Sequence, residues 1–187
     1  MADQTFHRIA ELQVASSDRV QAFFDANPEY WVRVFGNPPG PDDARKLFER
    51  VPPGSMTWRS KHVLEIAAAD GSVGAIADVI TDLEAPAVWH LGLFIAATRL
   101  HGTGETASLY RVLEGWMRQG RAEWSHLGVV VGNIPAERFW AKMGYTEVQL
   151  RKGVEMGARV VDLRRMVKPL AGGTIAGYRA IVPGDDP

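Results

Sequence analysis

Residues 89–145 constrain the fold more than any other part of the chain, because strand and helix patterns alternate there in a fixed order. The apolar run 90–97 predicts a strand, and an amphipathic helix is predicted from near Glu105 to Gly120, which is placed to end it. Residues 127–131 are apolar without alternation, which is typical of a strand covered on both faces, as in a parallel pair. The apolar face of the helix recurs at helical spacing in Leu109, Val112, Leu113, Trp116 and Met117. The order predicts a parallel strand pair with a right-handed crossover.

A turn with two glycines, residues 99–104, joins the first of these strands to the helix. Gly102 and Gly104 lack a Cβ, so the backbone there can approach a ligand closely. The first N–H groups of the following helix have no partner inside the helix, and the helix dipole favours an anion beside them. The turn is therefore a candidate phosphate site, although the spacing from Gly102 to Ala107 also occurs by chance in turns with a purely structural role.

Two other phosphate-binding motifs fit this turn less well. A dinucleotide fingerprint needs an acidic residue at the end of the next strand, about 20 residues further on. Here the next strand ends later, at Gly132 and Asn133. A Walker loop is excluded, because no Gly-Lys-Ser/Thr sequence follows the glycines.

A second, shorter helix is predicted after the second strand. Asn133 precedes Ile134 and Pro135, which is a favourable arrangement for starting a helix, and Gly144 stops it. One face of this helix carries Ala136, Phe139, Trp140 and Met143.

Together these two segments resemble the GNAT (Gcn5-related) N-acetyltransferase superfamily. Its acetyl-CoA loop, Q/R-x-x-G-x-G/A, is matched by Arg99, Gly102 and Gly104. Its segment N-x-x-A-x-x-F-Y/W-x-K-x-G-F/Y is matched by residues 133–145. Two motifs in the family's order are stronger evidence for the resemblance than one motif alone. The resemblance covers most of residues 5–168.

The resemblance implies an α/β fold of the α+β type. We expect a twisted, mostly antiparallel central sheet with a parallel central strand pair, flanked by helices. Residues 1–170 would form a single acetyltransferase domain, and residues 171–187 a mobile tail or an arm onto a partner.

The same resemblance implies direct transfer of the acetyl group of acetyl-CoA to a primary amine. The strand around Phe94 and Ile95 would supply backbone N–H groups to the thioester carbonyl. The acceptor amine is expected to be a small molecule rather than a protein, with a peptide N-terminus left open. The residues expected to bind acetyl-CoA are Phe94, Ile95, Arg99, Leu100, His101, Gly102, Thr103, Gly104, Glu105, Asn133, Ala136, Phe139 and Trp140.

Asp78 and His90 are the candidate general bases, because each lies on a strand expected to face the acceptor. Asp78 could equally be a solvated strand residue or an anchor for the amine, and His90 a half-buried sheet residue. For the general acid, Trp140 stands where better understood members of the family often have tyrosine. Solvent, Tyr145 or Tyr110 would then protonate the thiolate. Otherwise the chain is a non-catalytic acyl-CoA-binding or regulatory module, which is the alternative function.

Composition excludes several other classes of protein and of site. The chain has 187 residues, 46% of them hydrophobic, which suffices for one compact domain with a core of its own. A net charge of -1 gives no basic field for nucleic acid. The absence of cysteine excludes disulfides and thiolate metal sites, and no histidine has ligand spacing with acids, so we expect no metal. We found no signal peptide or membrane-spanning segment and expect a cytoplasmic protein, with a homodimer left open.

The rest of the chain supplies further elements. A strand is expected near residues 6–14, followed by a helix that Ser16 or Ser17 caps and that ends before Pro28. A short helix should begin at Asp42 and Asp43. Asp70-Gly71 signals a hairpin between strands at 62–68 and 73–81, and strands at 146–150 and 159–167 form another antiparallel pair.

Overall fold

A computed structural model describes residues 8–182 of the chain. One seven-stranded sheet in the order β1-β2-β3-β4-β5-β7-β6 organises the described part. Its strands are β1 (Ile9–Leu12), β2 (Ser60–Ala67), β3 (Val73–Thr81), β4 (Val88–Ala96), β5 (Trp124–Val130), β6 (Thr146–Met156) and β7 (Arg159–Pro169). All neighbours pair antiparallel except β4 and β5, which are parallel. The expected mixed sheet with a parallel central pair is confirmed.

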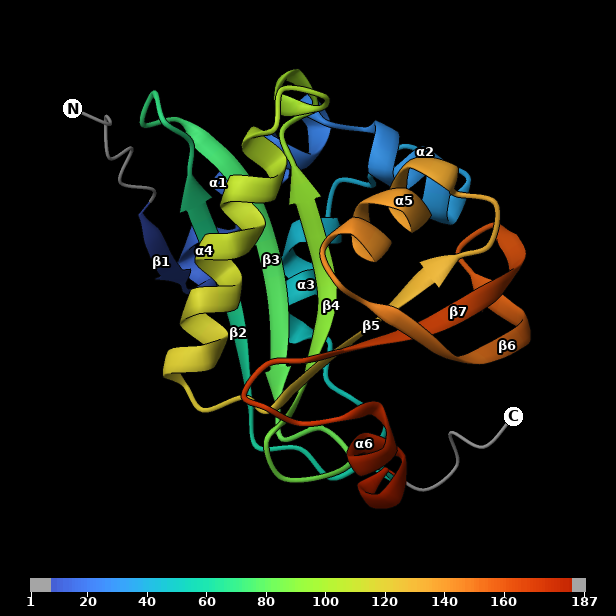
Figure 1. Ribbon diagram of the computed structural model, residues 1–187. Helices are drawn as coiled ribbons and strands as arrows, with labels where there is room; N and C mark the ends of the chain where they lie inside the picture. Colours follow the sequence, from blue (N-terminus) through green and yellow to red (C-terminus); the bar gives the residue numbers. More distant parts are fainter. Residues whose placement is uncertain (1–7, 183–187) are drawn as a thin grey trace.

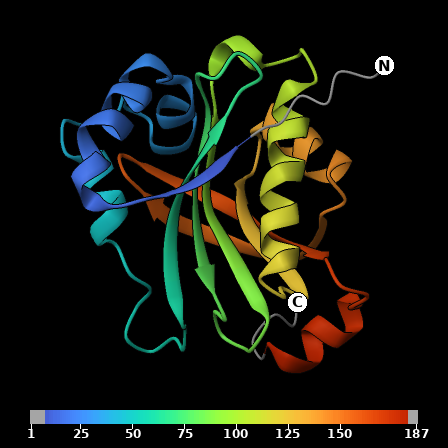
Figure 2. The same cartoon turned by 90° about the vertical axis from the view of Figure 1, so that its left-hand side faces the viewer.

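Helices cover both faces of this sheet (Figures 1 and 2). The helices are α1 (Ser17–Ala26), α2 (Glu29–Phe35), α3 (Asp43–Glu49), α4 (Glu105–Gln119), α5 (Ile134–Lys142) and α6 (Ile175–Ile181), with 3-10 turns η1 (Val14–Ser16) and η2 (Thr98–Leu100). Figure 2 shows α1 to α3 on one side and α4 and α5 on the other. The expected apolar stripe of α4 forms part of the core, because Leu109, Leu113 and Met117 are fully buried.

The parallel strands β4 and β5 are paired over only part of their length. Val88, Trp89 and His90 pair with residues 124–126 of β5, and beyond them the two strands diverge (Figure 1). The register of β4 also shifts at Gly92, because Asp78 pairs with Leu93 and Val79 with Leu91, which leaves Gly92 as a bulge. The divergence opens a wedge in the middle of the sheet, with unpaired strand edges on both sides.

Several elements begin and end where the sequence predicts. The observed β3 has the predicted bounds, β2 and β3 form the hairpin around Asp70-Gly71, and α4 runs from Glu105 to Gln119. The strand expected near residues 6–14 is observed as β1, and its first residues lie outside the described part. Ser16 takes the N-cap position of α1 but makes no side-chain cap hydrogen bond.

Two elements differ from the predictions. Helix α2 was not predicted, because Pro28 indicates the end of one helix; here it is also the N-cap of the next. Strand β6 continues through Gly153 to Met156, so that β6 and β7 are joined by the two residues Gly157 and Ala158 instead of a loop over 153–157.

Most of the segment expected as a tail or arm is folded against the domain. Helix α6 buries Tyr178 completely, Val182 is 1% exposed, and the indole of Trp124 donates to the Thr174 carbonyl oxygen over 3.1 Å. The Thr174 side chain caps the helix by accepting from the Gly177 N–H at 2.9 Å. The sequence did not predict this helix, because its first turn carries no acidic residue and Gly177 lies within it. Residues 183–187 lie outside the described residues.

Candidate functional site

A cavity of about 580 Å³ fills the wedge between β4 and β5, and we call it the wedge cavity. Its walls come from α2, the diverging halves of β4 and β5, the turn after β4, and α5. Alternate residues of a strand direct their N–H and C=O groups to opposite sides, so both strand edges present free backbone groups to this space. The expected acetyl-CoA residues that line it are Phe94, Ile95, His101, Gly102, Asn133, Ala136, Phe139 and Trp140.

The glycine turn stands at one end of the wedge cavity. Gly102 and Gly104 have φ of 78° and 90°, a region that side chains rarely adopt, and a Cβ at either would meet nothing within 4 Å. The N–H groups of Gly102, Gly104 and Thr106 make no hydrogen bond to any residue in the range 8–182. Free donors at the start of a 15-residue helix are the kind of group that binds an anion.

The flanking residues of the turn brace it rather than line the cavity. The guanidinium of Arg99 lies 3.4 Å from the Asp70 carboxylate and donates to the Ser72 hydroxyl, so it is tied to the β2–β3 hairpin. Glu105 accepts a hydrogen bond from the Ala69 N–H over 2.9 Å and ties the start of α4 to the same hairpin.

Two further turn residues also have internal partners. Leu100 is buried in the core, and its carbonyl oxygen accepts from the Thr103 and Thr106 hydroxyls at 2.8 and 3.2 Å. The Thr103 hydroxyl accepts in turn from the Glu105 N–H. These contacts hold the glycines in place, and neither Leu100 nor Thr103 lines the wedge cavity.

Helix α5 begins at the predicted residue but by a different contact. Asn133 is its N-cap without a side-chain cap hydrogen bond, and Glu137 instead accepts from the Gly132 N–H at 3.0 Å. The Asn133 side chain is therefore left to line the wedge cavity.

Trp140 belongs to an aromatic cluster on the same helix. It is 9% exposed, and the centroid of its ring lies 5.8 Å from the ring centroid of Phe94 and 5.3 Å from those of Tyr110 and Tyr145. Trp140 thus lines the cavity and is also part of the hydrophobic core.

The two tyrosines considered as acids are buried together. The Tyr110 hydroxyl donates to the Tyr145 hydroxyl over 3.1 Å, and Ser125 lies 2.7 Å from the latter. Burial raises the pKa of Tyr110 and raises that of Tyr145 to about 12. Neither residue lines the wedge cavity. The tyrosine that does line it is Tyr30 of α2, whose pKa burial raises to about 12.

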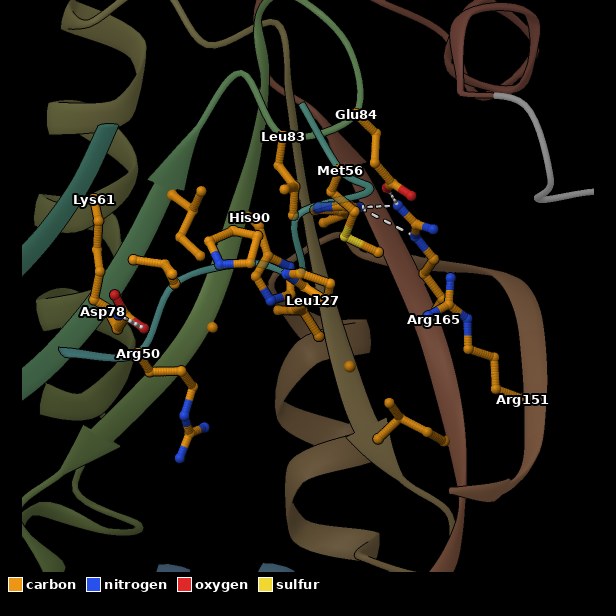
Figure 3. Close-up of a pocket in the computed structure, with 18 residues that line it drawn as sticks. Arg50, Met56, Lys61, Asp78, Leu83, Glu84, His90, Leu127, Arg151 and Arg165 are labelled. Atoms are coloured by element: carbon orange, nitrogen blue, oxygen red, sulfur yellow. Dashed lines mark hydrogen bonds and ion pairs between the residues drawn. The ribbon is translucent and has the colours of Figure 1, made fainter. Parts of the chain in front are cut away.

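A second cavity of about 280 Å³ adjoins the wedge cavity, and we call it the basic cavity (Figure 3). It is bounded by the segment after α3 and by β3, β4, β5 and β7. The residues that it shares with the wedge cavity are His90, Gly92, Gly128 and Leu163. The two cavities therefore meet at His90 and Gly92.

Asp78 lines the basic cavity from β3. Its carboxylate is buried and accepts from Lys61 Nζ over 2.9 Å, while Oδ1 has no hydrogen-bond partner among the described residues. Burial raises the pKa of Asp78, and the Lys61 charge opposes that rise. A buried pair with one unsatisfied oxygen is a polar site that a ligand donor could complete.

His90 lines both cavities and packs edge-on against His126, with 4.8 Å between the ring centroids. Burial lowers the pKa of His90 to about 4, and the Arg165 charge adds to the effect. His126 is held by the Arg165 Nε donor at 3.1 Å and lies 3.0 Å from the Tyr178 hydroxyl. His90 is therefore a neutral imidazole near pH 7 at the junction of the cavities.

Gly92 leaves a gap between the two candidate bases. A Cβ built on Gly92 would lie 3.1 Å from Asp78 Oδ2 and 3.6 Å from His90 Nε2. The structure thus brings Asp78 and His90 to the same small space, as expected from their strands.

Several cavity residues have no local signal in the sequence. Tyr30 lies on α2, the helix that was not predicted. The cations Arg50, Lys61, Arg151 and Arg165 come from four separate elements, so no spacing in the sequence joins them.

Residues 8–182 contain neither a membrane-spanning helix nor a cluster of metal-ligating side chains. No helix there is long and apolar enough to cross a membrane. No group of three or more histidine and acidic side chains in that range is placed to hold a metal ion.

Comparison with known proteins identifies the fold. Neither the protein-family models nor the curated proteins match the chain. Among solved structures, the ribosomal-protein-S18-alanine N-acetyltransferase from Escherichia coli is similar over 91% of this chain and 97% of its own, with a TM-score of 0.62 and 13% identity. Spermidine N-acetyltransferase from Vibrio cholerae, in complex with CoA and spermine, is similar over 88% and 96%, with a TM-score of 0.66 and 12% identity. A GCN5-related N-acetyltransferase from Kribbella flavida is similar over 88% and 98%, with a TM-score of 0.62 and 18% identity. The chain therefore has the fold of the GNAT (Gcn5-related) N-acetyltransferases.

Proposed function

We propose that this protein transfers the acetyl group of acetyl-CoA directly to the primary amine of a small molecule. The observation that carries the proposal is the continuous path from the glycine turn, through the wedge cavity, to His90 and Gly92 at the basic cavity. One end offers free backbone donors for a phosphate, and the other end offers a neutral imidazole beside a second cavity for the acceptor.

The cofactor side of the path suits an acyl-CoA. The free N–H groups of Gly102, Gly104 and Thr106 would hold the pyrophosphate, which needs donors but no lysine. The apolar rings of Phe94, Phe139 and Trp140 border the cavity beyond the turn and would pack against the pantetheine arm. Free N–H groups of the β4 edge would then donate to the thioester oxygen, where they stabilise the charge that develops during attack.

The acceptor side needs a group that takes a proton from the amine. A protonated amine has no lone pair, so it must lose a proton before its nitrogen attacks the carbonyl carbon and the C–S bond breaks. His90 is the better placed base, because it faces both cavities and is neutral, and it could act directly or through a water. Asp78 is paired with Lys61, so we assign it to the positioning of the amine.

The departing thiolate of CoA must gain a proton. Tyr110 and Tyr145 are unsuitable proton donors, because their hydroxyls are hydrogen-bonded to each other and neither residue lines the wedge cavity. Tyr30 borders that cavity and stays protonated near neutral pH, so Tyr30 and solvent are the two sources that we propose.

The second candidate is a non-catalytic module that binds acyl-CoA, and Trp140 in place of a tyrosine favours it. The decisive experiment measures thiol release from acetyl-CoA with a pool of small amines, and saturable stabilisation by acetyl-CoA, desulfo-CoA and NAD. We expect stabilisation by the two CoA compounds but not by NAD, and amine-dependent thiol release that His90→Gln reduces by about 10²-fold or more. Stabilisation without thiol release from any amine would favour the binding module. Absence of stabilisation by either CoA compound would refute both functions.

A further inference from the structure

The basic cavity carries an excess of positive charge. Its lining includes four cations, Arg50, Lys61, Arg151 and Arg165, but only two carboxylates, those of Asp78 and Glu84. Both carboxylates are already paired: Lys61 with Asp78 on one side of His90, and Arg165 with Glu84 on the other (Figure 3).

Arg50 and Arg151 are the cations left over. Arg151 donates through Nε to the Gln149 side chain over 3.0 Å, and within residues 8–182 neither guanidinium has an ion pair with a carboxylate. In Figure 3 they lie on opposite sides of His90. Four cations against two carboxylates leave two positive charges in the lining of this cavity.

The histidines of the cavity respond to this charge. Burial lowers the pKa of both His90 and His126, and the nearby Arg165 and Arg151 charges lower them further. Both rings are therefore neutral near pH 7 and do not change the charge balance. A cationic amine in this space would feel the same repulsion as the histidines.

The cavity is small, and part of its wall is apolar. Its volume of about 280 Å³ lies near the lower end for small-molecule sites, and its apolar wall includes Pro52, Pro53, Met56 and Leu127. Its size and lining suit a molecule of the size of an amino acid, with one apolar part and one charged part.

Resting on the acetyl-transfer function proposed above, we infer that the acceptor is a small amine that also carries an anionic group, such as a free amino acid. Its amine lies at Gly92 and His90, and its anionic group pairs with the unpaired guanidinium of Arg50 or Arg151. A guanidinium binds a carboxylate with two parallel hydrogen bonds, which fixes orientation as well as charge. The excess charge discriminates against polyamines, which bring two or more positive charges into the same cavity.

The test measures binding separately from turnover. Calorimetry on the full chain with saturating desulfo-CoA, which cannot react, compares phenylalanine with 2-phenylethylamine and leucine with isoamylamine. Aspartate, aminomethylphosphonate and spermidine complete the set. We expect the amines that carry a carboxylate or phosphonate group to bind most tightly. Phenylalanine and leucine should bind about ten-fold or more tightly than their decarboxylated partners. Comparing aspartate with aminomethylphosphonate distinguishes a carboxylate site from a phosphonate site.

Variants assign the site. Arg50→Gln or Arg151→Gln should reduce the preference for the anionic partner about ten-fold, and whichever does so identifies the anchor. Arg111→Gln is the matched control, because Arg111 is exposed on α4 and outside both cavities. Equal or tighter binding of the decarboxylated amines or spermidine would overturn the inference, as would no binding of any anionic member. Thiol release with spermidine but with none of the amines that carry an anionic group would support acetyl transfer and refute the inferred class of acceptor. An anionic preference without thiol release would retain the site and refute acetyl transfer.

Discussion

Replacing Gly104 with arginine separates the role of the glycine turn in binding from its role in folding. Gly104 has φ of 90°, and a Cβ there would meet no atom within 4 Å, so the substitution strains the backbone without a clash. An L residue in this region costs about 1–2 kcal/mol. A domain of this size loses ~2–4 °C per kcal/mol, so the variant should unfold roughly 2–8 °C below wild type.

The effect on binding is larger and depends on the ligand. Acetyl-CoA at about 100 times its dissociation constant adds ~2.7 kcal/mol, or roughly 5–11 °C, to wild type. The arginine side chain would occupy the space in front of the three free N–H groups, so we expect this stabilisation to disappear in Gly104→Arg. Thermal unfolding with and without acetyl-CoA gives both quantities from one assay.

Gly172→Arg is the matched control. Gly172 has φ of 82° and equally open surroundings, but it lies in the turn before α6, so the variant carries a similar strain away from the cavity. It should lose the same few degrees and keep the full stabilisation by acetyl-CoA. If Gly104→Arg retains wild-type stabilisation, the turn does not bind the cofactor and the assigned site is wrong.

Four further outcomes follow from the geometry. Gly92→Ala places a methyl group 3.1 Å from Asp78 Oδ2, so thiol release should fall about ten-fold or more while acetyl-CoA still binds; equal rates would show that the gap is not used. The pKa of His90 is lowered to about 4 in the folded state, so the unfolded chain binds more protons below its usual value of 6.5. Denaturant titration should therefore show that the free energy of unfolding declines as the pH falls from 6.5 to about 4. The decline should be less steep in His90→Gln. Trp140→Phe should keep most activity at a cost of about 1–2 kcal/mol, and loss of thiol release at unchanged acetyl-CoA affinity would contradict its packing role. Tyr178→Ala should cost about 3–5 kcal/mol in denaturant unfolding, because Tyr178 is fully buried; a cost near zero would mean that α6 does not stabilise the domain.

Local patterns in the sequence predicted the parts of the fold that depend on neighbouring residues. The bounds of β3 and α4 follow from a hairpin signal and an uninterrupted apolar stripe, and the glycines of the turn adopt positive φ because only glycine does so without strain. The cavity residues that were predicted, such as His101 and Asn133, come from the glycine turn and the start of α5, which local patterns also predicted. Helix α2 was missed because Pro28 indicates the end of the preceding helix, and α6 because its first turn carries no acidic residue like the one that predicts α3.

The sequence by itself determined the order of the strands, the parallel central pair and the turn at the start of α4. Only the tertiary structure decided how far β4 and β5 stay paired, and therefore where the wedge cavity opens, because divergence depends on the packing of helices against both faces. The charge of the basic cavity is likewise a tertiary property. Lys61, Arg151 and Arg165 lie on three different strands, β2, β6 and β7, and which cations remain unpaired depends on which carboxylates the fold brings to them.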